Sequence, residues 1–350
     1  MLICKIRKDF KKFSLDVDFK MENETLGFLG ASGSGKSLTL KCIAGLIRPD
    51  SGKIILNGRT LFDSEKKINL KPQDRRVGYL FQDYALFPNF TVEENVRTGL
   101  REDRDISDKL KEMHIYHIKD KLPKYISGGE KQRTALCRIL VNKPDILLLD
   151  EPFSALDEFL KNSIEAEVLN IINRYDLKTI LVSHSKDEAY RICDNIISIT
   201  KGHSAKKKTT KDFFARPDSL TEAKLIGINN FTSFRETSPG KYFANNWGIE
   251  ISADKLDTSS LYAIRSKDIT VSKNKEFNNS YKLDKFRLVE NIDSYTIIYN
   301  RDQEKYDNIS ISLDKEVYQD DLYFKIDPDK LIKLKEGWDE RSIWKRNFIS

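Results

Sequence analysis

The chain has 350 residues, of which 39% are hydrophobic and 33% are charged, a composition typical of a soluble protein that is somewhat rich in charge. This length exceeds what a single hydrophobic core usually supports, so we expect two domains. Sixty Lys and Arg residues against 54 Asp and Glu residues leave a formal net charge of +6, which is too small over this length to indicate nucleic-acid binding.

The chain begins with strand-like segments. Apolar residues partly alternate between positions 3 and 19, as in half-buried strands, and residues 26–29 form a short apolar run of strand type. Residues 38–44 have helical character. The eight residues between this strand and this helix fit the phosphate-loop pattern G-x-x-x-x-G-K-[ST] without a mismatch: Gly30, Ala31, Ser32, Gly33, Ser34, Gly35, Lys36 and Ser37.

A phosphate loop cradles the phosphates of a nucleotide. Its glycines let the backbone turn tightly enough to aim several N–H groups inward, and the positive end of the following helix adds to their attraction for phosphate. We expect Lys36 to reach the terminal phosphates of ATP and the Ser37 hydroxyl to bind Mg²⁺. The alternative, a Gly/Ser-rich turn with an incidental lysine, leaves the flanking strand and helix unexplained.

Further strands and helices follow the loop. Strands are predicted at residues 53–58, 76–81, 146–149, 179–183 and 195–200, and helices at residues 130–141 and 159–174. The polar stretch 101–125 keeps apolar residues at helical spacing, which predicts a small helical insertion. This alternation predicts an α/β domain over residues 1–203, with a helical subdomain at about residues 83–141.

The character of the sequence changes near Gly202. Residues 204–230, which include a run of three lysines, are predicted to be a solvated linker. From residue 231 to 350, short runs rich in Tyr, Phe, Ile and Ser recur between turn residues, at 242–244, 261–264, 295–299 and 309–313. This pattern predicts a β-rich domain of the small barrel or sandwich type, in which the aromatic residues form the core.

Cysteine usage and hydropathy limit the cellular setting. Four cysteines lie far apart without a C-x-x-C pair, which argues against a zinc site and a disulfide framework and favours a reducing cytosol. Charge appears too early in the sequence for a signal peptide. Because no stretch approaches the roughly 18 apolar residues of a membrane-spanning helix, any membrane role would require a partner.

Two carboxylates follow the apolar run 146–149, a Walker B pattern. Asp150, at the end of the predicted strand, can hold Mg²⁺ opposite Ser37, directly or through water. Glu151 lies one residue further, so strand alternation points it elsewhere, towards a water in line with the γ-phosphate. We interpret Glu151 as the general base; the alternative is a solvated acidic turn after a core strand.

A second possible anion site is formed by Ser127, Gly128 and Gly129, which open a predicted helix. Taken alone, this stretch is better interpreted as an ordinary helix N-cap. Its place between the phosphate loop and the Walker B strand favours the interpretation as an anion site. With Ile126, Glu130, Gln132 and Arg133 around it, the stretch resembles the signature motif of ATP-binding-cassette (ABC) ATPases.

The resemblance to ABC ATPases covers about residues 1–203. It implies that Gln82 is the Q-loop glutamine, which meets Mg²⁺ and the attacking water, and that His184 is the switch histidine, which contacts the γ-phosphate. It also implies that residues 154–157 form the D-loop. In this family the signature of one subunit closes over ATP held by the other, so Ser127, Gly128 and Gly129 should act in trans in a head-to-tail homodimer.

This sequence departs from the family pattern at three places. Ile126 replaces the usual Leu of the signature and Glu130 the usual Gln, and both changes leave the Ser-Gly-Gly core intact. The aromatic residue that stacks on adenine is not evident from the sequence. Phe10 and Phe13 are the candidates, although Phe13 fits equally well into the alternating strand.

The stretch from Gln82 to Val92 is similar to one in ATPase subunits of bacterial solute importers. There it forms the groove for a coupling helix of the membrane permease, a contact that exposed Tyr84, Leu86 and Phe87 would suit. The alternative, for any one of the three, is that it packs within the helical insertion. Residues 7–21 and 83–88 look most like importers of molybdate, tungstate or sulfate, which also append a small regulatory β domain.

The resemblance therefore predicts an ATPase that works with permease subunits and, through them, a solute-binding protein, at the cytoplasmic face of the membrane, with no nucleic acid involved. Importers of ferric iron, polyamines or sugars share the same architecture. A soluble ABC ATPase acting on ribosomes or DNA is an alternative of another class. In a further interpretation, compatible with transport, the C-terminal domain senses a ligand or a regulatory protein.

Overall fold

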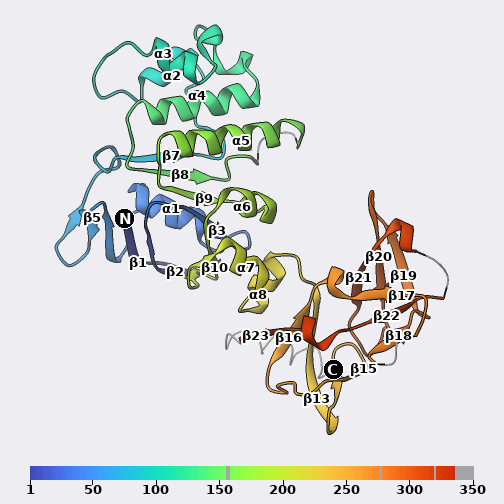
Figure 1. Cartoon of the computed structure of the whole chain (residues 1–350). Helices are drawn as coiled ribbons and strands as arrows, with labels where there is room; N and C mark the ends of the chain where they lie inside the picture. Colours follow the sequence, from blue (N-terminus) through green and yellow to red (C-terminus); the bar gives the residue numbers. More distant parts are fainter. Residues whose placement is uncertain (155–157, 276–277, 319–320, 336–350) are drawn as a thin grey trace. The chain divides into compact units, whose positions relative to one another are not determined.

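The computed structural model describes residues 1–154, 158–275, 278–318 and 321–335 (Figure 1). The chain divides into two compact units, the first from Met1 to Phe213 and the second beginning at Phe214. Each unit has a hydrophobic core of its own.

The described part of the first unit is built on a twelve-stranded mixed sheet. Its antiparallel part comprises β1 (Leu2–Phe10), β2 (Phe13–Met21), β4 (Ser51–Leu56), β5 (Arg59–Asp63) and β6 (Ile68–Asn69). Its parallel part runs in the order β10 (Asn195–Thr200), β3 (Thr25–Leu29), β9 (Thr179–Val182), β8 (Ile146–Asp150), β7 (Val77–Leu80). Strands β3, β8 and β9 are almost entirely buried, as their continuous apolar sequences predict. Because parallel strands end at one edge, the residues after β3, β7, β8 and β9 are brought together there.

Helices pack around this sheet and form a separate cluster in the middle of the sequence. The helices of the unit are α1 (Lys36–Ala44), α2 (Val92–Arg97), α3 (Ser107–Glu112), α4 (Gly128–Leu140), α5 (Glu158–Arg174) and α6 (Lys186–Ile192), with 3₁₀ turns η1 (Pro72–Asp74), η2 (Tyr116–Ile118) and η3 (Pro123–Tyr125). Figure 1 shows α2, α3 and α4 grouped together, which is the predicted helical insertion.

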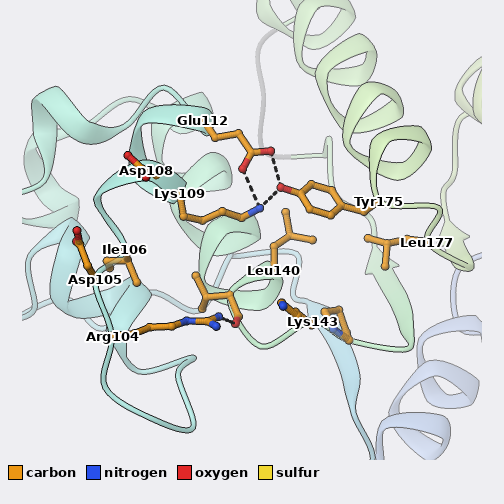
Figure 2. Close-up of a pocket in the computed structure, with 12 residues that line it drawn as sticks. Arg104, Asp105, Ile106, Asp108, Lys109, Glu112, Leu140, Lys143, Tyr175 and Leu177 are labelled. Atoms are coloured by element: carbon orange, nitrogen blue, oxygen red, sulfur yellow. Dashed lines mark hydrogen bonds and ion pairs between the residues drawn. The ribbon is translucent and has the colours of Figure 1, made fainter.

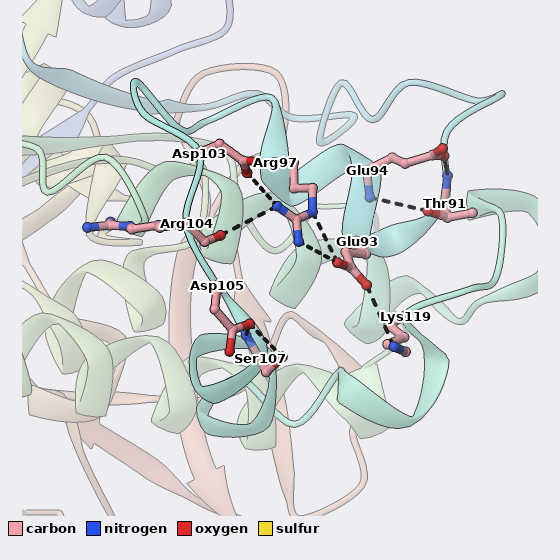
Figure 3. Close-up of polar contacts among 9 residues, drawn as sticks. All are labelled: Thr91, Glu93, Glu94, Arg97, Asp103, Arg104, Asp105, Ser107 and Lys119. Carbon is pink, nitrogen blue, oxygen red and sulfur yellow. Dashed lines mark hydrogen bonds and ion pairs between the residues drawn. The ribbon is translucent and has the colours of Figure 1, made fainter.

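The helical insertion is stabilised by its own caps and ion pairs. Thr91 and Glu94 form a capping box at the start of α2, in which each side chain accepts from the other residue's backbone N–H. One turn later, Arg97 pairs with Glu93 and with Asp103 (Figure 3). Of the five apolar residues that predicted the helical spacing, Leu122 is half-buried and the other four are 0–2% exposed: Leu110, Met113, Ile115 and Ile118.

Residues 204–230 are more ordered than the predicted linker. Strands β11 (His203–Ser204) and β12 (Lys208–Thr209) pair with β10, and helices α7 (Thr210–Ala215) and α8 (Leu220–Leu225) follow. Lys207 in the lysine run pairs with Glu24 at 2.6 Å. Two-residue strands carry no periodicity, and six-residue helices carry little, so the sequence showed only charge and turn residues here.

The described part of the second unit is a β structure of three antiparallel sheets around a shared core. The first sheet contains β13 (Asn230–Ser238), β14 (Lys241–Ala244), β15 (Ile249–Ser252), β16 (Leu261–Ile264) and β23 (Ile332–Leu334). The second contains β17 (Thr270–Ser272), β18 (Ser280–Lys282) and β22 (Tyr323–Lys325), and the third β19 (Phe286–Glu290), β20 (Ser294–Tyr299) and β21 (Ile309–Asp314). Three further 3₁₀ turns are η4 (Ser266–Asp268), η5 (Lys315–Val317) and η6 (Pro328–Lys330).

Aromatic residues form much of this second core, as predicted. Trp247, Phe234 and Phe324 are at most 2% exposed, and Phe234 packs edge-on against Trp247 and Tyr262. All four runs predicted as strands lie in strands β14, β16, β20 and β21. Within the described part of the chain, every helix is too short or too polar to span a lipid bilayer. The four cysteines are buried and free.

Candidate nucleotide-binding site

The phosphate loop connects β3 to α1 and depends on its glycines. Gly33 and Gly35 have positive φ angles of 74° and 110°. A Cβ atom on Gly30 would stand 2.2 Å from the carbonyl oxygen of Ile199, so no side chain fits there. Ala31, Ser32 and Gly33 are exposed at the mouth of the loop, whereas Ser34 and Lys36 are buried.

The buried donors of the loop fit a phosphate ligand. Among the described residues, the Lys36 ammonium donates hydrogen bonds only to the loop's own carbonyl oxygens, of Gly30 at 2.7 Å and Ala31 at 3.0 Å. Burial lowers the pKa of Lys36, against the opposing effect of Glu151 and Asp150. The buried hydroxyl of Ser34 makes no hydrogen bond to any described residue. Phosphate oxygens accept hydrogen bonds from donors of this kind. One is the buried hydroxyl of Ser34, and the other is the ammonium of Lys36, which bonds to its own loop.

Asp150 and Ser37, predicted to hold Mg²⁺ together, are in direct contact. The Ser37 hydroxyl donates to Oδ1 of Asp150 at 2.7 Å, and Asp150 is only 7% exposed at the end of β8. A carboxylate beside a hydroxyl is an oxygen donor set that suits Mg²⁺.

Tyr79 joins this pair, and the sequence analysis missed it. Its phenol donates to Oδ2 of Asp150 at 2.7 Å. Burial first, and then the hydrogen bond to Asp150, raise the pKa of Tyr79, so it stays a donor. Tyr79 lies opposite Leu148 in the β7–β8 ladder, two positions before Asp150, and therefore points to the same face of the sheet. Finding Tyr79 from the sequence would have required a prediction of how β7 pairs with β8 and in which register.

Glu151 and His184, both predicted to act on the reaction, are also in contact. Oε1 of Glu151 lies 2.5 Å from Nε2 of His184. Glu151 follows β8 and His184 lies just after β9, two strands that are far apart in the sequence. Glu151 has φ = 51°, in the left-handed region that non-glycine residues rarely adopt. Its backbone N–H donates to Val182 at 3.0 Å, which holds the turn in place. Backbone strain of this kind concentrates at functional sites.

Gln82 follows β7 at the same sheet edge and is exposed. Its side chain makes no hydrogen bond to the described residues, so the structure places it beside the site without joining it to the other groups. Of the D-loop residues 154–157, only Ser154 is described; Ala155, Leu156 and Asp157 lie outside the described residues.

The Ser-Gly-Gly stretch caps α4, as either interpretation of the sequence requires. The Ser127 hydroxyl donates to Oε2 of Glu130 at 2.9 Å, and the same oxygen accepts from the Ser127 N–H at 2.7 Å. Hydrogen bonds from Ser127 lower the pKa of Glu130, although burial opposes them. No hydrogen bond joins Ser127, Gly128 or Gly129 to the phosphate loop in the described chain, and Figure 1 shows α4 beside α2 and α3, apart from α1.

The two candidate aromatic residues differ in their surroundings. The ring of Phe13 lies beside the phosphate loop, since a Cβ on Gly35 would come within 3.2 Å of its Cζ atom. Phe10 is 41% exposed, and its ring centroid is 6.2 Å from that of Phe13. Phe13 is therefore the better placed of the two to contact a base.

The expectation that Tyr84, Leu86 and Phe87 are all exposed is wrong for Tyr84. Only 4% of Tyr84 is exposed, its backbone has a left-handed φ of 61°, and Leu86 is half-buried. Phe87 is 47% exposed and packs at 5.2 Å against Phe90, which is 42% exposed and was not predicted. The exposed aromatic pair is therefore Phe87 and Phe90.

A pocket of about 600 Å³ lies elsewhere in this unit, lined by α3, the end of α4 and the end of α5 (Figure 2). Lys109, Glu112 and Tyr175 contact one another across it, and Glu112 also pairs with Arg174 at 2.9 Å. Its lining includes none of the predicted nucleotide-binding residues. The polar groups satisfy one another, so this contact fastens the helical insertion to α5.

Comparison with known proteins agrees with the geometry. Residues 13–154 match the ABC transporter family. A glucose import ATP-binding protein from Saccharolobus solfataricus is 33% identical over 282 residues, covering 77% of this chain and 78% of that protein. A molybdenum import ATP-binding protein from Rhodospirillum rubrum is 37% identical over 213 residues, which cover 58% of this chain and 57% of that protein. A Fe(3+) ions import ATP-binding protein from Haemophilus influenzae is also 37% identical, with coverages of 61% and 62%.

Solved structures show the same fold. The dimeric structure of MJ0796, a bacterial ABC transporter cassette, superposes with a TM-score of 0.51 and 25% identity, covering 60% of this chain and 99% of that one. The fold and the residues gathered at the sheet edge define an ATPase of the phosphate-loop class. More narrowly, the chain belongs to the ABC transporter family and has its ATP-binding fold.

Proposed function

We propose that this chain is the ATP-hydrolysing subunit of an ABC importer, which binds MgATP as a homodimer and drives solute uptake through permease subunits at the cytoplasmic face of the membrane. The observation that carries the proposal is the meeting of Lys36, Ser37, Asp150, Glu151 and His184 at one sheet edge. The import ATP-binding proteins among its relatives support the transport role.

The reaction follows from these positions. Lys36 and the loop N–H groups hold the terminal phosphates, and Glu151 accepts a proton from a water as the water oxygen bonds to the γ-phosphorus. The bond from the γ-phosphorus to the bridging oxygen breaks, which yields ADP and inorganic phosphate. His184 orients Glu151 and contacts the γ-phosphate. Ser37, Asp150 and Gln82 would hold Mg²⁺, which neutralises charge on the phosphates.

The site is composite in this proposal. At the start of α4, Ser127 is exposed, Gly128 is half-buried and Gly129 is buried. Because this helix start lies apart from α1 and its phosphate loop, these residues serve the nucleotide of a second copy. The dimeric cassette structure supports this arrangement. ATP hydrolysis should then rise more steeply than linearly with protein concentration below the dimer dissociation constant.

For the solute, we propose an oxyanion such as molybdate, tungstate or sulfate. Molybdenum, molybdate/tungstate and sulfate/thiosulfate import proteins at 35–37% identity support it. Sugar import is a second candidate, because the glucose import relative matches over 77% of this chain and therefore beyond the first unit. We also propose that the second unit, as a separate β domain, regulates transport.

The test uses the transporter reconstituted in vesicles with its permease and solute-binding protein. ATP hydrolysis is measured with molybdate, tungstate, sulfate or glucose on the binding protein. Stimulation by an oxyanion alone supports the first candidate, and stimulation by glucose alone supports the second. Absence of any ATP hydrolysis, with a Lys36→Ala variant as the background control, would contradict the ATPase proposal itself.

A further inference from the structure

A second cavity, the basic hollow, adjoins the pocket between α3, α4 and α5. It has a volume of about 370 Å³ and shares Arg104, Val141 and Lys143 with that pocket, so the two cavities lie on either side of these residues. Arg76 and Arg101 complete the cationic lining of the basic hollow. Neither cavity contains a residue of the proposed nucleotide site, so ATP hydrolysis does not account for them.

Three of the cations in the basic hollow lack a carboxylate partner among the described residues: Arg101, Arg104 and Lys143. The guanidinium of Arg101 donates to the carbonyl oxygen of Gln73 at 3.0 Å, and that of Arg104 donates to the carbonyl oxygen of Val141. The Lys143 ammonium makes no hydrogen bond or ion pair within the described chain. Neutral carbonyl groups therefore hold two guanidinium groups in place without cancelling their charge.

Most acids near the basic hollow are already paired. Asp103 pairs with Arg97 at 2.8 Å (Figure 3). Asp145 pairs with Arg76 at 3.4 Å. Of the acids that line the basic hollow, Glu102 alone has no ion pair within the described chain. Three unpaired cations therefore face one unpaired carboxylate, which leaves an excess of positive charge there.

Two of the four cationic positions also have a strained backbone. Arg76, just before β7, has φ = 55°, and Lys143, just after α4, has φ = 47°. Backbone strain of this kind concentrates at functional sites. Like charges that line one cavity also repel one another, and a bound anion removes that repulsion. Both observations indicate a binding site for an anion.

The larger pocket places an apolar wall next to this charge. Five apolar side chains line it: Ile106, Leu140, Val141, Pro144 and Leu177. The polar contact on its other side, between α3 and the end of α5, is satisfied within the protein (Figure 2). Its volume of about 600 Å³ lies within the range of about 300–1,000 Å³ that is typical of pockets for small organic molecules. The pocket therefore suits the apolar part of a ligand whose charge lies in the basic hollow.

We propose that the pocket and the basic hollow together bind a small organic phosphate. Its phosphate contacts Arg101, Arg104 and Lys143, and its planar or apolar body lies in the pocket. Guanidinium groups suit this task because their N–H donors match the geometry of phosphate oxygens. The ligand touches residues 101–109 of the helical insertion and the ends of α4 and α5, so its binding strengthens the contact between them.

The experiment measures the binding of phenyl phosphate, inorganic phosphate and phenol to the full chain by isothermal titration calorimetry. Saturating MgADP is present to occupy the phosphate loop. Phenyl phosphate carries both parts of the proposed ligand, and the other two probes carry one part each. We expect phenyl phosphate to bind at least about tenfold more tightly than either, because the ring and the phosphate each gain contacts of their own.

Two substitutions test the cations. Lys143→Met and Arg104→Gln should each weaken the binding of phenyl phosphate by about tenfold, as expected for the loss of one charge-assisted hydrogen bond. The matched control is Lys121→Met, which removes another exposed lysine of the helical insertion that has no ion pair in the described chain and lines neither cavity. It should bind phenyl phosphate like the parent. Thermal unfolding identifies the variants that fold, and Arg101→Gln replaces either one that does not.

Amide hydrogen exchange locates the site. Phenyl phosphate should slow exchange in residues 101–109 and at the ends of α4 and α5 in the parent protein, and much less in Lys143→Met. Equal affinities for phenyl phosphate and either single-part probe would overturn the proposal, because one of the two cavities would then contribute nothing. Unchanged binding in the folded cation variants, or no binding of phenyl phosphate at millimolar concentration, would overturn it as well.

Discussion

The two halves of the proposed ATP site differ in how complete they are within one copy of the chain. At the sheet edge the groups already contact one another: Ser37 meets Asp150, and Glu151 meets His184. At the start of α4, the Ser127 side chain bonds only to Glu130 of its own helix among the described residues. In the proposed dimer, the difference means that one copy preassembles the groups for the chemistry and a second copy supplies the closing face.

The largest expected effect is at the preassembled half. Glu151→Gln should lower kcat by about 10²–10⁴-fold, because the amide cannot accept the proton of the attacking water. ATP should still bind, so the variant should accumulate as an ATP-bound dimer. Single-turnover hydrolysis and size-exclusion chromatography with MgATP measure the two effects. Hydrolysis at the parent rate would exclude Glu151 as the base.

The second prediction tests whether the closing face comes from another copy. Lys36→Ala and Ser127→Ala should each be impaired alone, Lys36→Ala by more than about tenfold because it loses the charge-assisted contact with phosphate. An equimolar mixture should regain activity, because a mixed dimer contains one site with both residues intact. Activities of the two proteins, separately and mixed, decide the matter; a mixture no better than the average of its parts would contradict sharing.

A smaller effect is expected at Tyr79, within the preassembled half. Tyr79→Phe removes one hydrogen bond to Asp150, equivalent to about 1–2 kcal/mol, and leaves the ring packed against Phe81. The Mg²⁺ concentration for half-maximal ATP binding should therefore rise several-fold, with little change in binding of ATP without metal. Titration with a fluorescent ATP analogue follows both; an unchanged Mg²⁺ requirement would show that Tyr79 does not orient Asp150.

The smallest effect concerns the contact that fastens the helical insertion to α5. Although burial alone would raise the pKa of Glu112, hydrogen bonds from Tyr175, Lys109 and Arg174 lower it to about 2, from a usual value of 4.5. Because the folded-state pKa is the lower one, the contribution to stability is present above pH 4.5 and is lost as the pH falls towards 2.

Urea unfolding at pH 6 and at pH 3 measures this contribution. The variant Glu112→Gln should be less stable than the parent at pH 6, and the difference should shrink at pH 3. Asp108→Asn is the control, since this exposed carboxylate pairs only with Lys111 and should behave like the parent. A difference that stays constant with pH would assign the role of Glu112 to packing instead of charge.

Much of the ATPase unit could be predicted from the sequence because its chemistry is local. The phosphate loop, the acidic strand end after β8 and the helix opened by Ser127 each require particular residues within a few positions of one another, so they are visible without a structure. The strands of the second unit were visible from their alternation, although their pairing into three small sheets was not, since pairing joins residues far apart in the chain.

What the amino-acid sequence determined by itself is the class of ATPase, the order of its motifs and the groups that we propose to perform the chemistry. Only tertiary structure placed Tyr79 against Asp150, buried Tyr84, exposed Phe90 and brought Lys143 to the same cavity as Arg101 and Arg104. These contacts depend on strand register, on left-handed backbone angles and on side chains that meet across the fold. None of the three leaves a short-range pattern in the sequence.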